Sequence, residues 1–256
     1  MKEIRKSPEE IELQQKEELL NQKQDVLAEL ELSLSTLEGQ LKSFEIEYYL
    51  KVGSKYVQVD QLQAIFDKIL AAKIPFDATA QKRAAESQAK AEQSAHDAEG
   101  FSHDEGNSQR PEATPELKAL YREAAKLFHP DLTLDPNEKE RRHHLMQQTN
   151  EAYQKGDIEK LQQIFDAEKN NPELIKGDDI GSALVRVIRK IHQVDKRIPD
   201  IESAIAALQS TDLFHLKETV EKEAEKGIDL LAKLGDELLS RIMFLERQIE
   251  IANKGN

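Results

Sequence analysis

Leucine recurs every seven residues through the first fifty positions of this chain, and this repeat constrains the fold more than any other feature. One seam is made by Leu13, Leu20, Leu27, Leu34, Leu41 and Tyr48. A second seam, present from mid-segment onward, is made by Leu30, Leu37 and Phe44. Lys16 and Lys23 hold the second position nearer the start. The pattern predicts a long coiled-coil helix, weaker at its start, whose apolar face must pack against another helix.

Local signals mark the limits of this first arm. Residues 7–10 combine an N-cap serine, a proline suited to the first helical position and two glutamates. Gly53 and Ser54 interrupt the heptads, after which an apolar pattern resumes. Residues 75–99 are rich in alanine and charge but lack a strong apolar stripe, which predicts an exposed helix. Residues 100–113 contain glycine, asparagine and proline and predict a flexible linker.

A second coiled-coil pattern occupies the C-terminal part of the chain. Its apolar residues alternate steps of three and four at Leu184, Val187, Ile191, Val194, Ile198, Ile201, Ile205 and Leu208. Pro199 lies inside this run and is expected to kink or divide the helix. A final helix carries Leu213, Leu216, Val220, Leu231, Leu234, Leu238, Leu245 and Ile249. Gly227 and Gly235 weaken this last helix locally.

Both arms present seams too apolar to be left in water, and we interpret them as packing surfaces with no ligand pocket. Either the two arms pair within one chain, or arms from two chains pair to give a homodimer. We expect the pairing to be antiparallel.

The composition agrees with long solvated helices. Charged residues make up 33% of the 256 residues and aromatic residues only 5%, which is poor material for a large globular core. A net charge of −13 argues against nucleic acid or an acidic membrane surface as the main partner. The absence of cysteine excludes disulfides, thiolate zinc sites and cysteine nucleophiles. No apolar run reaches transmembrane length and the start lacks a signal-peptide core, so a cytoplasmic location is expected.

Between the arms lies a segment of short helices. Thr114 is a candidate N-cap, followed by proline and glutamate. One face of the helix that follows is apolar, formed by Leu117, Leu120, Tyr121, Ala124, Leu127 and Phe128. A different face carries a basic stripe of Lys118, Arg122 and Lys126. Pro130 disfavours helical geometry at His129, so the helix should end near Phe128 and leave His129 extended.

The loop ends in a second helix start. Residues 135–138 give an N-cap aspartate, a proline at the first position and a glutamate at the third, which is a capping-box pattern. The second helix closes with the sequence Asn-Glu-Ala-Tyr at residues 150–153 and a C-cap glycine, Gly156. A third short helix follows, with Leu161 on its apolar side.

Two helices joined by a His-Pro-Asp loop, with Leu-Lys-x-x-Tyr-Arg before it and Asn-Glu-Ala-Tyr after it, resemble the J-domain of the DnaJ co-chaperone family. The resemblance covers about residues 114–168. The family's opening helix is not visible upstream, and Leu132 stands where many members carry a lysine. The glycine/phenylalanine-rich region and the zinc-binding repeats of full-length DnaJ are absent.

The resemblance implies that the segment binds a DnaK-type (heat shock protein 70) chaperone and stimulates its ATPase, with no bond chemistry of its own. The implied chaperone-binding residues are His129, Pro130, Asp131, Lys118, Tyr121, Arg122 and Lys126. The loop side chains are expected to lie outside the packed face, so their replacement should spare the fold.

The sequence therefore predicts an all-α protein with two coiled-coil arms flanking a small J-domain-like module. The predicted parts are an arm at 1–99, a linker at 100–113, the module at 114–172 and a second arm at 179–256. The arms would bind a client protein or position the module. We expect no enzymatic activity, cofactor or metal. The alternative is a coiled-coil scaffold with a vestigial J-like segment.

Overall fold

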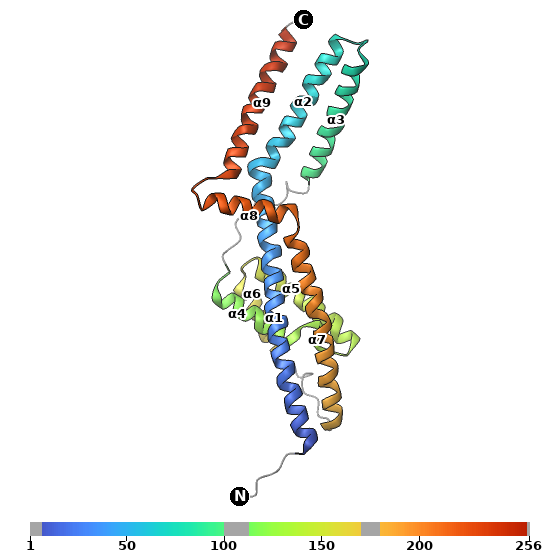
Figure 1. The fold of residues 1–256 in the computed structure, drawn as a ribbon, viewed down its shortest axis with the longest axis vertical. Helices are drawn as coiled ribbons and strands as arrows, with labels where there is room; N and C mark the ends of the chain where they lie inside the picture. Colours follow the sequence, from blue (N-terminus) through green and yellow to red (C-terminus); the bar gives the residue numbers. More distant parts are fainter. Residues whose placement is uncertain (1–6, 100–112, 170–179, 255–256) are drawn as a thin grey trace. The chain divides into compact units, whose positions relative to one another are not determined.

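The computed structural model describes residues 7–99, 113–169 and 180–254, and they are helical with no strand (Figure 1). The elements are α1 (Pro8–Tyr48), η1 (Tyr49–Gly53), α2 (Ser54–Lys73), α3 (Ala78–Glu99), α4 (Pro115–Phe128), η2 (Pro130–Leu132), α5 (Pro136–Gln154), α6 (Ile158–Lys169), α7 (Ile180–Gln209), α8 (Asp212–Ala224) and α9 (Leu230–Lys254). The all-α prediction is confirmed for these residues. None of these helices is both long and apolar enough to span a membrane.

The chain divides into two compact units, and each arm contributes to both. The first unit comprises residues 1–40 and 110–211, and the second comprises residues 41–109 and 212–256. This grouping differs from the serial division expected from the sequence, because each unit is assembled from segments far apart in the chain. The predicted linker lies outside the described residues except for Ala113.

The first arm begins as its sequence predicts and continues through its interruption. The Ser7 N–H donates to Glu10 at 2.6 Å, and the Glu10 N–H donates to the Ser7 hydroxyl at 3.2 Å, which completes the capping box. Gly53 and Ser54 do not break the helix. The chain passes through one stretch of π-helix, η1, before α2 begins.

In the first unit, α1 and α7 lie side by side and run in the same direction (Figure 1). Lys23 contacts Asp195 at 2.5 Å, and further along both helices Glu31 contacts Arg197 at 3.0 Å. The antiparallel pairing expected from the sequence is therefore wrong for this pair. More than a hundred residues separate the two helices, enough for the chain to return to the same end. Pro199 does not divide α7, which is one continuous helix.

The second unit also contains a parallel pair, α2 with α9. Arg241 donates to Gln63 at 3.2 Å, and Lys73 donates to the Ala252 carbonyl at 2.5 Å. Gly235 was expected only to weaken α9, but its lack of a side chain lets α9 pack closely against η1. A Cβ added there would lie 2.9 Å from the Lys51 carbonyl oxygen, so α9 approaches the backbone where only glycine fits.

The helix α3, expected to be exposed, packs one side against α2 through small residues and buried carboxylates. Asp67 pairs with Arg83 at 3.0 Å, and Asp60 pairs with Lys90 at 2.9 Å and Ser94 at 2.6 Å. The partner numbers fall on α3 as they rise on α2, so these two helices form an antiparallel hairpin.

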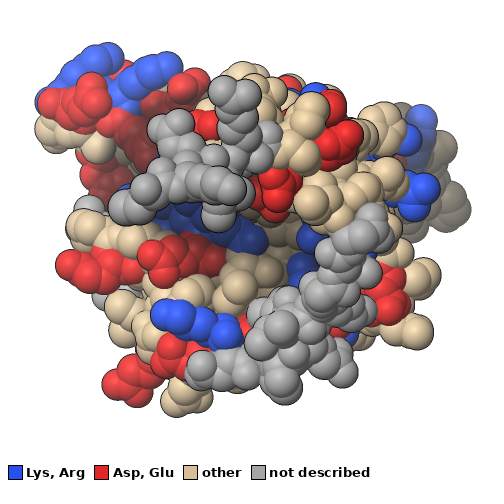
Figure 2. Space-filling view, turned by 90° about the horizontal axis from the view of Figure 1, so that it is seen from below, with Lys and Arg blue, Asp and Glu red and all other residues tan. Residues whose placement is uncertain are grey.

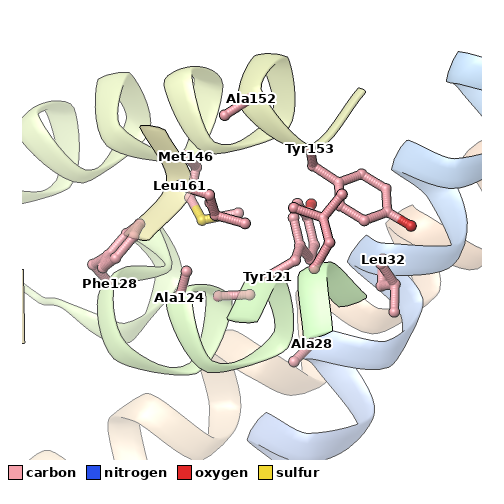
Figure 3. Close-up of a cluster of buried hydrophobic side chains, with 11 residues drawn as sticks. Ala28, Leu32, Tyr121, Ala124, Phe128, Met146, Ala152, Tyr153 and Leu161 are labelled. Atoms are coloured by element: carbon pink, nitrogen blue, oxygen red, sulfur yellow. The ribbon is translucent and has the colours of Figure 1, made fainter. Parts of the chain in front are cut away.

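The core of the J-like module is completed by α1. Its buried side chains are Ala28 and Leu32 from α1, Leu117, Tyr121, Ala124, Ala125 and Phe128 from α4, Met146, Ala152 and Tyr153 from α5, and Leu161 from α6 (Figure 3). α1 thus supplies cover for a helix hairpin that lacks a visible opening helix of its own. This cover explains how so short a segment buries an aromatic core.

Candidate functional site

The helix α4 begins at the predicted cap and turns its apolar face into the module. The Thr114 hydroxyl accepts the Leu117 N–H at 3.2 Å. Tyr121 is 0% exposed, and its ring lies 4.8 Å from that of Tyr153. The Tyr121 hydroxyl donates to the Asn150 side chain at 2.6 Å, and burial raises the pKa of Tyr121 above its usual value. Contact between Tyr121 and a partner is therefore excluded in this conformation, because its ring lies wholly inside the core.

His129 leaves the helix in the extended conformation that Pro130 predicts, with φ −57° and ψ 135°. Its side chain is buried, which contradicts the expectation that it lies outside the packed surface: His129 is only 2% exposed. Its Nε2 lies 2.9 Å from a carboxylate oxygen of Glu31, and its Nδ1 accepts the Asp131 N–H at 3.1 Å. These two contacts suit the neutral tautomer that carries its proton on Nε2. Replacing His129 should therefore affect folding as well as any binding.

Glu31 of α1 is the buried acceptor on which the site depends. The same oxygen that faces His129 accepts Arg197 from α7 at 3.0 Å. Burial alone would raise the pKa of Glu31, but the hydrogen bond with His129 and the charge and hydrogen bond of Arg197 hold that pKa below its usual value. The loop is thus tied through one carboxylate to both α1 and α7.

Asp131 also has partners within the chain. Its carboxylate pairs with Lys139 of α5 at 2.8 Å and lies 3.8 Å from Arg197 of α7. The side chain is 18% exposed, so it is less available than a free loop carboxylate would be. Beside the loop lies a cleft of about 350 Å³. Its lining includes Glu31, His129, Pro130, His143, Asn150 and Arg197.

Leu132, which follows the His-Pro-Asp turn, is a buried residue of the loop. Its side chain is buried in a cluster with Leu20 and Leu27 of α1 and Val194 and Ile201 of α7. A lysine at this position would place a charge among these side chains. Position 132 therefore needs an apolar side chain for the loop to pack against α1 and α7.

The basic stripe of α4 is partly ion-paired with α1. Arg122 contacts Glu29 at 3.1 Å, and Lys126 contacts Asp25. Lys118 is exposed, and no ion pair of Lys118 is described. On the face shown in Figure 2, visible Lys and Arg side chains lie beside Asp and Glu. The seven predicted residues lie along α4 and the loop that follows it. Tyr121 and His129 are buried, Arg122 and Lys126 pair with carboxylates of α1, and Asp131 pairs with Lys139.

The start of α5 departs from the expected capping box. The Asp135 carboxylate accepts the Asn137 N–H at 2.9 Å, as an N-cap should. Glu138, however, holds Arg141 and Arg142, each at 2.8 Å, instead of reaching back to the Asp135 N–H. The hydrogen bond from Arg141 is the main reason that the pKa of Glu138 lies at about 2, well below its ordinary value of 4.5. Arg141 also binds Glu168 of α6 at 2.7 Å.

We expect this arginine–glutamate cluster to make acid stability depend on Glu138. Because the folded pKa is depressed, the stabilisation is fully present above about pH 4.5 and is lost as the pH falls toward 2. The gap in melting temperature between wild type and Glu138→Gln should therefore be largest near neutral pH and should close toward pH 2. Thermal melts at stepped pH measure it, with exposed Glu140→Gln as the control. A gap that is constant with pH would contradict the assignment.

No pattern in the sequence marks Glu31 or Arg197 as site residues. Both residues flank their heptad seams, where charged residues are common on any coiled-coil-like helix. Only their side-chain contacts identify them as the groups that hold the loop. The leucine at position 132 is visible in the sequence, but its burial depends on the meeting of α1 and α7.

Comparison of the chain with protein-family models, with curated proteins and with solved structures finds no match.

Proposed function

We propose that this protein is a co-chaperone that binds a DnaK-type chaperone and stimulates its ATPase through the loop at His129–Asp131 and the basic face of α4. The observation that carries the proposal is the joint placement of these groups. The His-Pro-Asp turn closes the α4–α5 hairpin, and Lys118, Arg122 and Lys126 extend from it along α4. The arms would bind a client or position the module. A cytoplasmic location suits this role.

The chemistry of the loop also supports the proposal. Pro130 fixes the backbone, and Asp131 presents a carboxylate that already attracts cations, Lys139 and Arg197, in this chain. A carboxylate held in this way is a good acceptor for a guanidinium on a partner. Cations on the adjacent helix face would meet an acidic surface of the chaperone, and such contacts mainly speed association.

A second candidate, a coiled-coil scaffold, is favoured by one observation. His129 and Tyr121 are buried, and the loop braces α1 against α7. In that case the His-Pro-Asp turn would be a structural wedge that engages no chaperone.

The Asp131→Asn variant distinguishes the two functions. We expect it to abolish stimulation, because asparagine keeps the shape of aspartate and removes its charge. Its melting temperature should fall little, because asparagine fills the same space and Lys139, which is 52% exposed, stays solvated when its pair with Asp131 is lost. The measurement is single-turnover ATP hydrolysis by a DnaK-type chaperone, with and without the full-length protein.

Asp135→Asn is the matched control, because it makes the same chemical change four residues away and asparagine is an equally good N-cap. It should stimulate hydrolysis as wild type does. If Asp131→Asn is as active as wild type, or if wild type never stimulates hydrolysis, the scaffold function replaces the proposed one.

A further inference from the structure

The helix α7 holds the His-Pro-Asp loop but contributes nothing to the core of the module. The module core is built from α1, α4, α5 and α6. Among the described residues of α7, only Val194 and Ile201 are buried, and both lie in the cluster that contains Leu132. By contrast, α1 supplies Ala28 and Leu32 to the core itself. α7 can therefore separate from the loop without opening the module, whereas α1 cannot.

Arg197 occupies the position that a partner's cation would need. Its guanidinium bonds Glu31 at 3.0 Å and lies 3.8 Å from the Asp131 carboxylate. An arginine from a partner would have to compete for the Asp131 carboxylate with Arg197, and with Lys139 at 2.8 Å. The side chain of Arg197 is 36% exposed, so it can return to water when it is displaced.

Most of the apolar seam of α7 is only partly buried: Val187, Ile191, Ile198 and Ile205 pack beside the two buried residues. Pro199 removes one backbone hydrogen bond from α7 between its two buried residues. The pKa of Lys190 is lowered first by burial and then by the positive charges of Arg142 on α5 and Arg186 on its own helix. The positive charges of α5 and α7 thus repel one another. A seam that is only partly buried opens at a lower free energy than a fully buried core.

We propose that α7 is an autoinhibitory clamp on the His-Pro-Asp loop, held by Arg197 and by the contacts of Leu132, and that the chaperone gains the loop when α7 separates. This inference rests on the proposed function. The activating ligand is the chaperone surface itself, with a guanidinium that replaces Arg197 at Asp131. The module stays folded on α1 in both states.

The Arg197→Glu variant should open the clamp. A carboxylate at this position would face Glu31 and Asp131 and be repelled by both. We expect amide hydrogen exchange in residues 129–134 to become about fivefold faster or more, and chaperone stimulation to rise by a similar factor, as a coupling of typical size would give. Helix content by circular dichroism should stay close to wild type.

Lys196→Glu is the matched control. The residue is adjacent, exposed and absent from the described contacts, and the change of charge is the same. It should leave both readouts at their wild-type values.

A covalent lock provides the opposite variant. Because the chain has no cysteine, Lys23→Cys with Asp195→Cys can be joined by a cleavable bis-maleimide, which fixes α7 to α1 at an existing ion pair. The locked protein should stimulate hydrolysis less than the same protein after cleavage of the linker. Treatment with a monofunctional maleimide controls for the modification itself.

The outcomes separate the clamp from the function. If exchange at the loop is unchanged in Arg197→Glu, the clamp is wrong whatever the ATPase shows. If exchange rises but neither wild type nor Arg197→Glu stimulates any hydrolysis, the proposed co-chaperone function fails, and the regulation of it fails as well. If wild type and locked protein stimulate equally, the function stands and the clamp does not regulate it.

Discussion

Replacing Tyr121 by alanine should lower the free energy of unfolding by about 3–5 kcal/mol, the range for deleting a fully buried aromatic side chain. Tyr121 is 0% exposed and stacks obliquely on Tyr153, with Leu32 of α1 in the same cluster (Figure 3). Removing the ring would leave a cavity where α1, α4 and α5 meet. Chemical denaturation, monitored by circular dichroism, measures the loss.

Tyr121→Phe is the matched variant, because it keeps the ring and removes only the hydroxyl that bonds Asn150. It should cost about 1 kcal/mol, the usual net value of one hydrogen bond. If the alanine variant were nearly as stable as wild type, Tyr121 would not be a core residue. The chaperone-contact role implied by the family resemblance would then return.

Features set by short-range chemistry were predictable from the sequence. Thr114, Asp135 and Pro130 each act within three residues of themselves, and their caps and the extended backbone at His129 occur as expected. The apolar spacing likewise placed Leu117 and Phe128 in the core. These features depend on local backbone geometry and on helical periodicity, and both can be read directly from residue order.

Features set by contacts between distant segments were not predictable. The parallel direction of α1 and α7 depends on how far the chain travels between them, and a heptad seam has no intrinsic direction. The burial of His129 requires Glu31, a residue 98 positions away in the chain. The stripe residue Arg122 looks like a solvated cation until α1 places Glu29 beside it. The candidate site was therefore located by its motif, whereas its accessibility had to come from the structure.

The change with the most direct bearing on the loop is Leu132→Lys, which introduces the residue that many J-domains carry after the aspartate. Leu132 is 5% exposed among Leu20, Leu27, Val194 and Ile201, so the variant loses a buried leucine and places an ammonium in an apolar cluster. Loss of the buried leucine alone costs about 2–5 kcal/mol, and desolvating the charge adds to it. We expect a loss of about 3 kcal/mol or more, with the loop leaving the seam between α1 and α7.

Leu134→Lys is the control, since Leu134 lies two residues further along the same loop and is 40% exposed. It should change the free energy of unfolding by less than about 0.5 kcal/mol, as surface substitutions do. Denaturation and hydrogen exchange at residues 129–134 together test the pair. The module core contains no side chain of α7, so the helices α4, α5 and α6 should remain protected in Leu132→Lys while the loop exchanges quickly. Equal stability of the two lysine variants would mean that Leu132 does not hold the loop. The apolar contacts of Leu132 would then contribute nothing to the proposed clamp.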